Sequence, residues 1–182
     1  MQELKDRIVK EGKVLPGNII KVDGFLNHRV DTELLEHIAD EFGRRFDMSK
    51  VTVILTAEAS GIALATVVAH RFGKPMIFAK KAKSDNIEGG LYQSDIFSYT
   101  YKKKVTLLVS KEWLHESDRV LIIDDFMANG EAMRGLCDIV TAAGAELVGI
   151  GCAVEKGFQG GGDRLRAAGY DLESLAIIES AQ

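Results

Sequence analysis

Cysteine and proline are scarce in this chain, with two residues of each among 182. The cysteines, Cys137 and Cys152, have neither the number nor the spacing of a zinc site or a disulfide framework, so we expect reduced core thiols. A hydrophobic content of 46% and a charged content of 27% are ordinary globular values and exclude a disordered chain. A chain of this length predicts one domain with a substantial core.

Long apolar runs and an excess of positive charge are also missing. No stretch approaches the roughly 20 apolar residues that span a bilayer, and the charged start MQELKDRIVKEG lacks the apolar segment of a signal peptide. We therefore expect a cytoplasmic protein that binds no membrane. The 23 basic residues against 27 acidic ones give a net charge of −4, which argues against a surface that binds nucleic acid.

Short apolar runs rich in β-branched residues alternate with helical patterns along most of the chain. Because alternating strands and helices build parallel sheets, this order predicts an α/β fold whose mostly parallel, twisted sheet is flanked by helices. A hairpin is expected instead at 94–101 and 105–110, with Lys102–Lys104 at its turn. We expect the other strands at residues 51–55, 76–79, 120–123, 147–154 and 175–178, and helices that include residues 34–46, 62–72, 133–140 and 164–168.

The segment RVLIIDDFMANGEAMRGLC, residues 119–137, joins an apolar strand to a helix through two carboxylates and a loop of small residues. Ligands of parallel sheets gather beyond the carboxyl ends of the strands, where this loop is expected. Small side chains and a helix start suit a phosphate, because backbone N–H groups can approach the anion closely. The acidic pair, Asp124 and Asp125, would repel that phosphate, so we expect it to face sugar hydroxyls or a hard cation such as Mg²⁺.

A second turn of small residues, TAEASG at 56–61, follows another predicted strand and precedes an alanine-rich helix. Two such loops on one sheet edge predict a ligand with two separated phosphate groups. Lys80–Lys83 leaves a strand at the same edge and can supply cations, whereas Lys102–Lys104 reads as a solvated turn. Taken by themselves, residues 22–31 (VDGFLNHRVD) read as a surface connection with one apolar anchor.

Four segments in order, NIIKVDGFLNH, TAEASGIALA, VLIIDDFMANGEA and AVEKGFQ, resemble the type I phosphoribosyltransferases, and among them the bacterial enzymes that use xanthine, over nearly the whole length. The resemblance implies a single phosphoribosyltransferase domain over residues 1–182. It also implies a hood over the base, formed by 14–31 and 155–163, and a hairpin lid at 80–104. A hood replaces the surface connection as the interpretation of residues 22–31.

The resemblance further implies that the sugar donor is 5-phosphoribosyl diphosphate (PRPP). Asp124 and Asp125 would be catalytic, acting on the ribose hydroxyls and the Mg²⁺ shell, while Mg²⁺ itself is held mainly by PRPP and water. The residues implied to bind PRPP are Ala128, Asn129, Gly130, Glu131 and Ala132 at the 5′-phosphate, Glu58, Ala59, Ser60 and Gly61 at the diphosphate, and Lys81.

The purine contacts that the resemblance implies are Ile20, Asn27, Phe126 and Lys156. Two positions depart from the family pattern: Ile20 stands where leucine is expected, and Ala59 stands where serine is common. The implied reaction moves the phosphoribosyl group of PRPP to xanthine, giving xanthosine 5′-monophosphate and diphosphate, in a homodimeric enzyme. Two alternatives stay open, a transferase for hypoxanthine, guanine or adenine and a non-catalytic PRPP-sensing regulatory domain.

Overall fold

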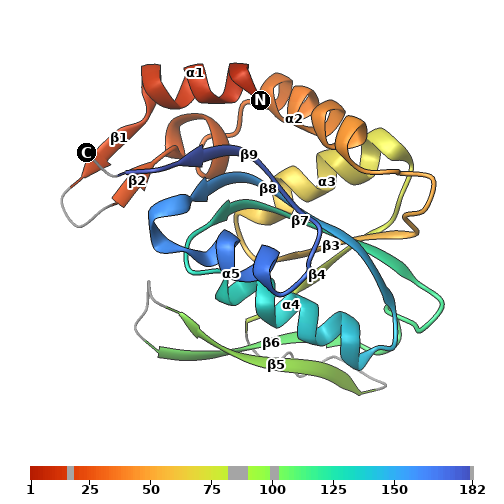
Figure 1. Cartoon of the computed structure of the whole chain (residues 1–182). Helices are drawn as coiled ribbons and strands as arrows, with labels where there is room; N and C mark the ends of the chain where they lie inside the picture. The colour runs from red at the N-terminus through yellow and green to blue at the C-terminus, as the bar shows by residue number, and fades with distance from the viewer. Residues whose placement is uncertain (16–18, 82–89, 99–102, 181–182) are drawn as a thin grey trace.

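A computed structural model of the chain describes residues 1–15, 19–81, 90–98 and 103–180. Its centre is a five-stranded, all-parallel sheet with the strand order β4-β3-β7-β8-β9 (Figure 1), which confirms the predicted α/β fold. Parts of the predicted hood (16–18) and lid (82–89 and 99–102) lie outside the described residues. The strands of this sheet are β3 (Val53–Ala57), β4 (Met76–Ala79), β7 (Arg119–Met127), β8 (Glu146–Lys156) and β9 (Leu172–Ile178).

Two small antiparallel sheets accompany the parallel one. The first pairs β1 (Lys13–Leu15) with β2 (Ile19–Lys21), and the second is the hairpin of β5 (Leu91–Ser98) and β6 (Lys103–Ser110). A single antiparallel bridge between Lys80 and Leu108 ties the hairpin to the chain just beyond β4.

Helices cover both faces of the parallel sheet (Figure 1). One face carries α1 (Gln2–Glu11), α2 (Thr32–Arg45) and α3 (Gly61–Phe72), and the other carries α4 (Glu131–Ala142), α5 (Gly161–Ala167) and the β5–β6 hairpin. Two shorter helical turns are η1 (Asp23–Asn27) and η2 (Gly157–Gln159). Among the described residues, no helix is both long and apolar enough to cross a bilayer.

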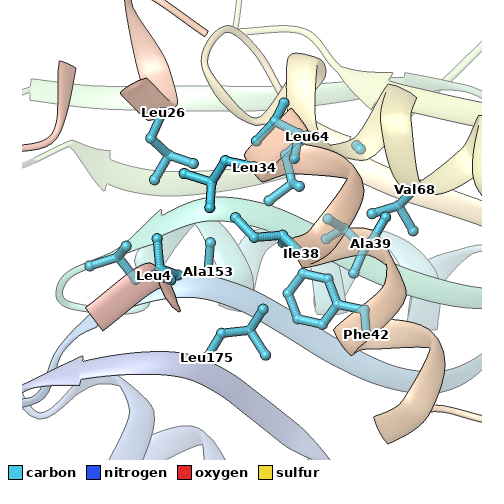
Figure 2. Packing of buried hydrophobic residues seen from close by; sticks show 14 of the residues in the cluster. Leu4, Leu26, Leu34, Ile38, Ala39, Phe42, Leu64, Val68, Ala153 and Leu175 are labelled. Atoms are coloured by element: carbon cyan, nitrogen blue, oxygen red, sulfur yellow. The ribbon is translucent and has the colours of Figure 1, made fainter. Parts of the chain in front are cut away.

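The core is divided by the sheet because side chains alternate between its two faces. Leu121 and Ile123 of β7 pack with the helices α1 to α3, whereas Val120 and Ile122 pack with α4 and the hairpin. Figure 2 shows the first of these clusters, in which the apolar face of α2 meets α3 and the sheet. The labelled residues of this cluster are Leu4, Leu26, Leu34, Ile38, Ala39, Phe42, Leu64, Val68, Ala153 and Leu175.

The sheet differs from the sequence prediction mainly at the end of β7. The apolar run was expected to end before the acidic pair, but β7 continues to Met127. Its partner β8 also runs on, and Asp124 pairs with Cys152 while Phe126 pairs with Val154. The acidic pair therefore lies within a strand, and the pairing of its backbone with β8 fixes its position.

The predicted hairpin is present with shifted strand ends. Its first strand begins at Leu91 instead of residue 94, and the pairing of Ser98 with Lys103 places Lys103 and Lys104 in the second strand. The first strand also contacts α4, which no local pattern reveals: the buried Ser94 donates a hydrogen bond to Asp138 at 2.8 Å. The hairpin is thus packed on α4 over the described residues.

Candidate active site

A cavity of about 320 Å³ opens beyond the carboxyl ends of β3, β7 and β8. Its size is that of a small-molecule site. Its position agrees with the rule that parallel sheets bind ligands at this edge. Its lining includes the following predicted site residues: Glu58, Ser60, Lys81, Asp124, Asp125, Phe126, Ala128, Asn129, Gly130, Glu131, Ala132 and Lys156.

The acidic pair lies at the floor of this cavity and is almost entirely buried, with Asp124 7% and Asp125 2% exposed. Oδ1 of Asp124 accepts the backbone N–H of Asp125 at 2.9 Å, and Oδ1 of Asp125 accepts the hydroxyl of Ser60 at 2.9 Å. Burial, with the neighbouring charge of Asp125 as a second cause, raises the pKa of Asp124 well above its ordinary value. Within the described part of the chain, Oδ2 of Asp125 is buried without a hydrogen-bond partner.

The loop formed by residues 58–61, which we call the diphosphate loop after the role predicted for it, packs closely against the acidic pair. A side chain at position 61 would overlap Oδ1 of Asp124 and the hydroxyl of Thr56, so only glycine allows this close approach. Glu58 accepts the backbone N–H of Lys81 at 2.7 Å and so joins the loop to the chain beyond β4. The loop and the acidic pair therefore form one unit.

Residues 128–132, which we call the phosphate loop after the role predicted for it, join β7 to α4. Gly130 takes φ = +76°, in the left-handed region that favours glycine, and stands immediately before the helix. It has no side chain that could cap the first N–H groups of α4. These groups and the positive end of the helix dipole are therefore available to an anion in the cavity.

The other end of the cavity carries a lysine over an aromatic ring. Nζ of Lys156 lies 5.1 Å from the centre of the Phe126 ring, close enough for a cation–π interaction. Partial burial lowers the pKa of Lys156. A planar ring in this region would meet both an aromatic face and a hydrogen-bond donor.

Four of the predicted site residues do not line the cavity: Ile20, Asn27, Ala59 and Gly61. Ile20 is 8% exposed and packs in the core, and Asn27 is the last residue of η1. η1 is held by two buried side chains, Phe25 and Leu26, where the sequence suggested one apolar anchor. The roles of Ile20 and Asn27 at the base stay predictions.

Three cavity residues come from the hairpin and were not among the predicted site residues: Ile96, Phe97 and Val105. The backbone N–H of Phe97 donates to Glu131 of the phosphate loop at 3.3 Å. Thr56 was also missed, although its fully buried hydroxyl lies beside the acidic pair. The lid expected at 80–104 already included Ile96 and Phe97, but long-range packing decides which hairpin side chains reach the cavity.

The donor set suits a cation that is held mostly by its ligand. Among the described residues, no group of three or more His, Cys, Asp or Glu side chains is placed to hold a metal ion. Mg²⁺ keeps several waters and usually takes one or two carboxylates together with substrate phosphates. The acidic pair, with an unpaired buried oxygen on Asp125, fits that requirement.

Known proteins resemble this chain over nearly its full length. The sequence profile of the phosphoribosyl transferase domain matches residues 29–174. The chain is 53% identical over 181 residues to a xanthine phosphoribosyltransferase of Bifidobacterium adolescentis. That alignment covers 99% of this chain and 94% of the relative. It is 56% identical over 180 residues to a xanthine phosphoribosyltransferase of Lachnoclostridium phytofermentans, with 99% and 93% covered.

Solved structures share the fold at lower identity. An adenine phosphoribosyltransferase of Giardia lamblia in complex with 9-deazaadenine aligns with a TM-score of 0.82 at 20% identity, covering 97% of this chain and 98% of that one. The adenine phosphoribosyltransferase of Rhodothermus marinus aligns with a TM-score of 0.78 at 19% identity, covering 98% and 100%. The domain profile and the full-length relatives, together with this fold, establish that the chain belongs to the phosphoribosyltransferase family.

Proposed function

We propose that the protein is a purine salvage enzyme that transfers the 5-phosphoribosyl group of PRPP to xanthine, giving xanthosine 5′-monophosphate and diphosphate. The observation that carries the proposal is one cavity lined by an acidic pair, two anion loops and a lysine over an aromatic ring. The relatives above 50% identity are named xanthine phosphoribosyltransferases, which supports the choice of base.

The cavity offers PRPP a separate place for each of its charged groups. The phosphate loop takes the 5′-phosphate through backbone N–H groups at the start of α4. The acidic pair faces the ribose hydroxyls, which donate to carboxylates. The diphosphate loop takes the leaving group, with the cation of Lys81 at the same wall of the cavity.

Xanthine is recognised at the end of the cavity that holds Phe126 and Lys156. The base packs on the Phe126 ring, and the Lys156 ammonium donates to an exocyclic oxygen. The exocyclic amine of adenine cannot accept that hydrogen bond, so adenine would gain nothing from the lysine that xanthine gains. We propose that Asn27 and Ile20 complete this recognition from the hood.

The reaction breaks the bond between ribose C1 and the diphosphate oxygen, forms a bond between C1 and a purine nitrogen, and releases the proton of that nitrogen to solvent. Positive charge gathers on the ribose ring and negative charge on the departing diphosphate. The acidic pair orients the ribose through its hydroxyls, and Lys81 with the backbone of the diphosphate loop stabilises the leaving group. Mg²⁺, when bound to PRPP, neutralises diphosphate charge as a Lewis acid. No nucleophilic side chain is required.

A diphosphate-release assay with PRPP and Mg²⁺ tests the proposal when xanthine, guanine, hypoxanthine and adenine are supplied in turn. We expect the highest kcat/KM with xanthine and release that stops when EDTA removes the metal. Faster release with another base would reassign the substrate. Absence of release with every base, together with PRPP binding, would identify a PRPP-sensing domain instead.

The family resemblance also leads us to propose that the enzyme works as a homodimer in the cytoplasm. Sedimentation equilibrium of the purified chain tests the oligomeric state. A monomer mass across the micromolar range would contradict the dimer.

A further inference from the structure

The outer side of the phosphate loop is in direct contact with the backbone of α5. A Cβ atom at Gly161 would overlap the carbonyl oxygen of Ala128 and would lie 2.6 Å from the nitrogen of Gly130. A Cβ at Gly130 would lie 3.3 Å from the carbonyl oxygen of Gly161. No side chain fits between these two backbones, so the start of α5 and the loop are in direct van der Waals contact.

Arg164 adds a polar contact to the same interface. Its Nη2 donates to the carbonyl oxygen of Asn129 at 3.0 Å and lies 3.5 Å from that of Gln159. A peptide group is planar, so a fixed carbonyl also fixes the N–H of the residue that follows. Arg164 therefore holds the orientation of the peptide between Asn129 and Gly130, in the middle of the phosphate loop.

α5 has only seven residues, too few to be stable by itself, and it is anchored by a partly buried ion pair. Glu155 at the end of β8 is 1% exposed and accepts hydrogen bonds from Nη1 and Nη2 of Arg166 at 3.2 and 2.7 Å. The hydroxyl of Ser174 on β9 also donates to Glu155. Gly162 packs against the same carboxylate with no room for a side chain. The position of α5 is thus set by β8 and β9.

We infer that α5 is the support that keeps the phosphate loop in its anion-binding shape, with Gly161 and Arg164 as positioning residues for the 5′-phosphate. This inference rests on the proposed function, which assigns the 5′-phosphate to that loop. A loop of small residues has many accessible conformations, and binding an anion through backbone N–H groups requires one of them. Contact with α5 removes the alternatives before the ligand arrives.

Two ligand fragments separate the two phosphate sites experimentally. Ribose 5-phosphate probes the phosphate loop, and Mg²⁺-diphosphate probes the diphosphate loop, both by isothermal titration calorimetry without any base. The test variants are Arg164→Met and Gly161→Ala, and the matched control is Arg44→Met, because Arg44 is 71% exposed on α2.

We expect Arg164→Met to weaken ribose 5-phosphate about three- to tenfold, the loss of one ordinary hydrogen bond, because Arg164 is exposed and its charge is solvated. Gly161→Ala should weaken it more, because the added methyl displaces the loop. Both variants should bind Mg²⁺-diphosphate within about twofold of the parent and raise the KM for PRPP more than that for xanthine. Arg164→Lys, which keeps a donor, should recover part of the affinity, and Arg44→Met should change neither ligand.

Parental affinity for ribose 5-phosphate in Arg164→Met would overturn the inference. So would equal losses for both fragments, since that pattern indicates general destabilisation. If Gly161→Ala does not fold, Arg164→Met still tests the inference, because Arg164 is exposed and its replacement should not prevent folding. A parent enzyme that binds both fragments but releases no diphosphate with xanthine contradicts the proposed function. The role of α5 is then still decided by the affinity of the variants for ribose 5-phosphate. A parent that releases diphosphate with xanthine but does not bind ribose 5-phosphate overturns the inference about α5 and leaves the proposed function standing.

Discussion

Replacing Asp124 by asparagine should make the protein more stable and almost inactive. Asp124 and Asp125 are adjacent, 7% and 2% exposed, and burial together with the second charge raises the pKa of Asp124. Asparagine has nearly the same shape, and its side-chain oxygen can still accept the backbone N–H of Asp125, which Asp124 accepts at 2.9 Å. The substitution therefore removes a buried charge and keeps the local hydrogen bond.

The gain in stability should depend on pH in a defined direction. A carboxyl group whose pKa is higher in the folded than in the unfolded protein favours folding at low pH, and this contribution is lost as pH rises through the folded-state pKa. Asp124→Asn should therefore gain little at pH 4. Above the raised pKa it should gain about 1–2 kcal/mol, the usual size when a functional strain is removed. For a domain of this length that gain raises Tm by about 2–8 °C.

The loss of activity should be much larger than the gain in stability. Removing one electrostatic group from a preorganised site lowers kcat about 10²- to 10³-fold, or about 3–4 kcal/mol of activation free energy. Diphosphate release gives kcat, and differential scanning fluorimetry between pH 4 and 8 gives Tm. Asp47→Asn is the control, because Asp47 is 54% exposed and lies in a turn that is also compatible with asparagine. A parental kcat, or a lower Tm at pH 8, would refute the reasoning.

Three further substitutions test other parts of the site. Arg166→Met removes the cation that pairs with the buried Glu155 carboxylate, and it should lower the free energy of unfolding in urea by about 3 kcal/mol. This is the lower end of the range for a broken buried pair, because Arg166 is 34% exposed. A variant as stable as the parent would contradict this prediction. Lys156→Met should lower kcat/KM for xanthine about 10- to 100-fold with the KM for PRPP unchanged, as for a lost charge-assisted hydrogen bond; equal changes in both would speak against a base contact. Ser60→Ala removes the 2.9 Å hydrogen bond to Asp125 and should lower kcat about tenfold in single-turnover assays, whereas a change within twofold would exclude that role.

Local sequence patterns were sufficient for the sheet and the main loops. The apolar runs at 51–55, 76–79 and 147–154 each fall on a strand of the parallel sheet, although β3 begins only at Val53. The inner strands are apolar because both of their faces are covered, whereas the edge strand β4 leaves Phe78 38% exposed. The end of β7 could not be predicted in this way. Asp124 and Asp125 are poor strand residues, and only the backbone ladder to β8 keeps them in one.

The candidate site was predictable where it is built from consecutive residues. The acidic pair and the phosphate loop come from one segment, so their proximity is already present in the chain. The hairpin residues Ile96 and Phe97 and the contact of Gly161 with the loop depend on parts of the chain more than 30 positions away. Glycine at 161 looks like ordinary loop composition until the backbone of the neighbouring loop is found against it.

The end of β8 connects the two halves of the site through the alternation of a strand. Glu155 and Lys156 are consecutive, so their side chains leave the strand on opposite sides. Lys156 enters the cavity beside Phe126, and Glu155 enters the interior to anchor α5 through Arg166. If β8 were shifted by one residue, the carboxylate of Glu155 would point into the cavity and the ammonium of Lys156 would point into the interior. The register of β8 against β7 and β9 is therefore what allows one strand end to present a donor to the base and to support the loop that holds the phosphate.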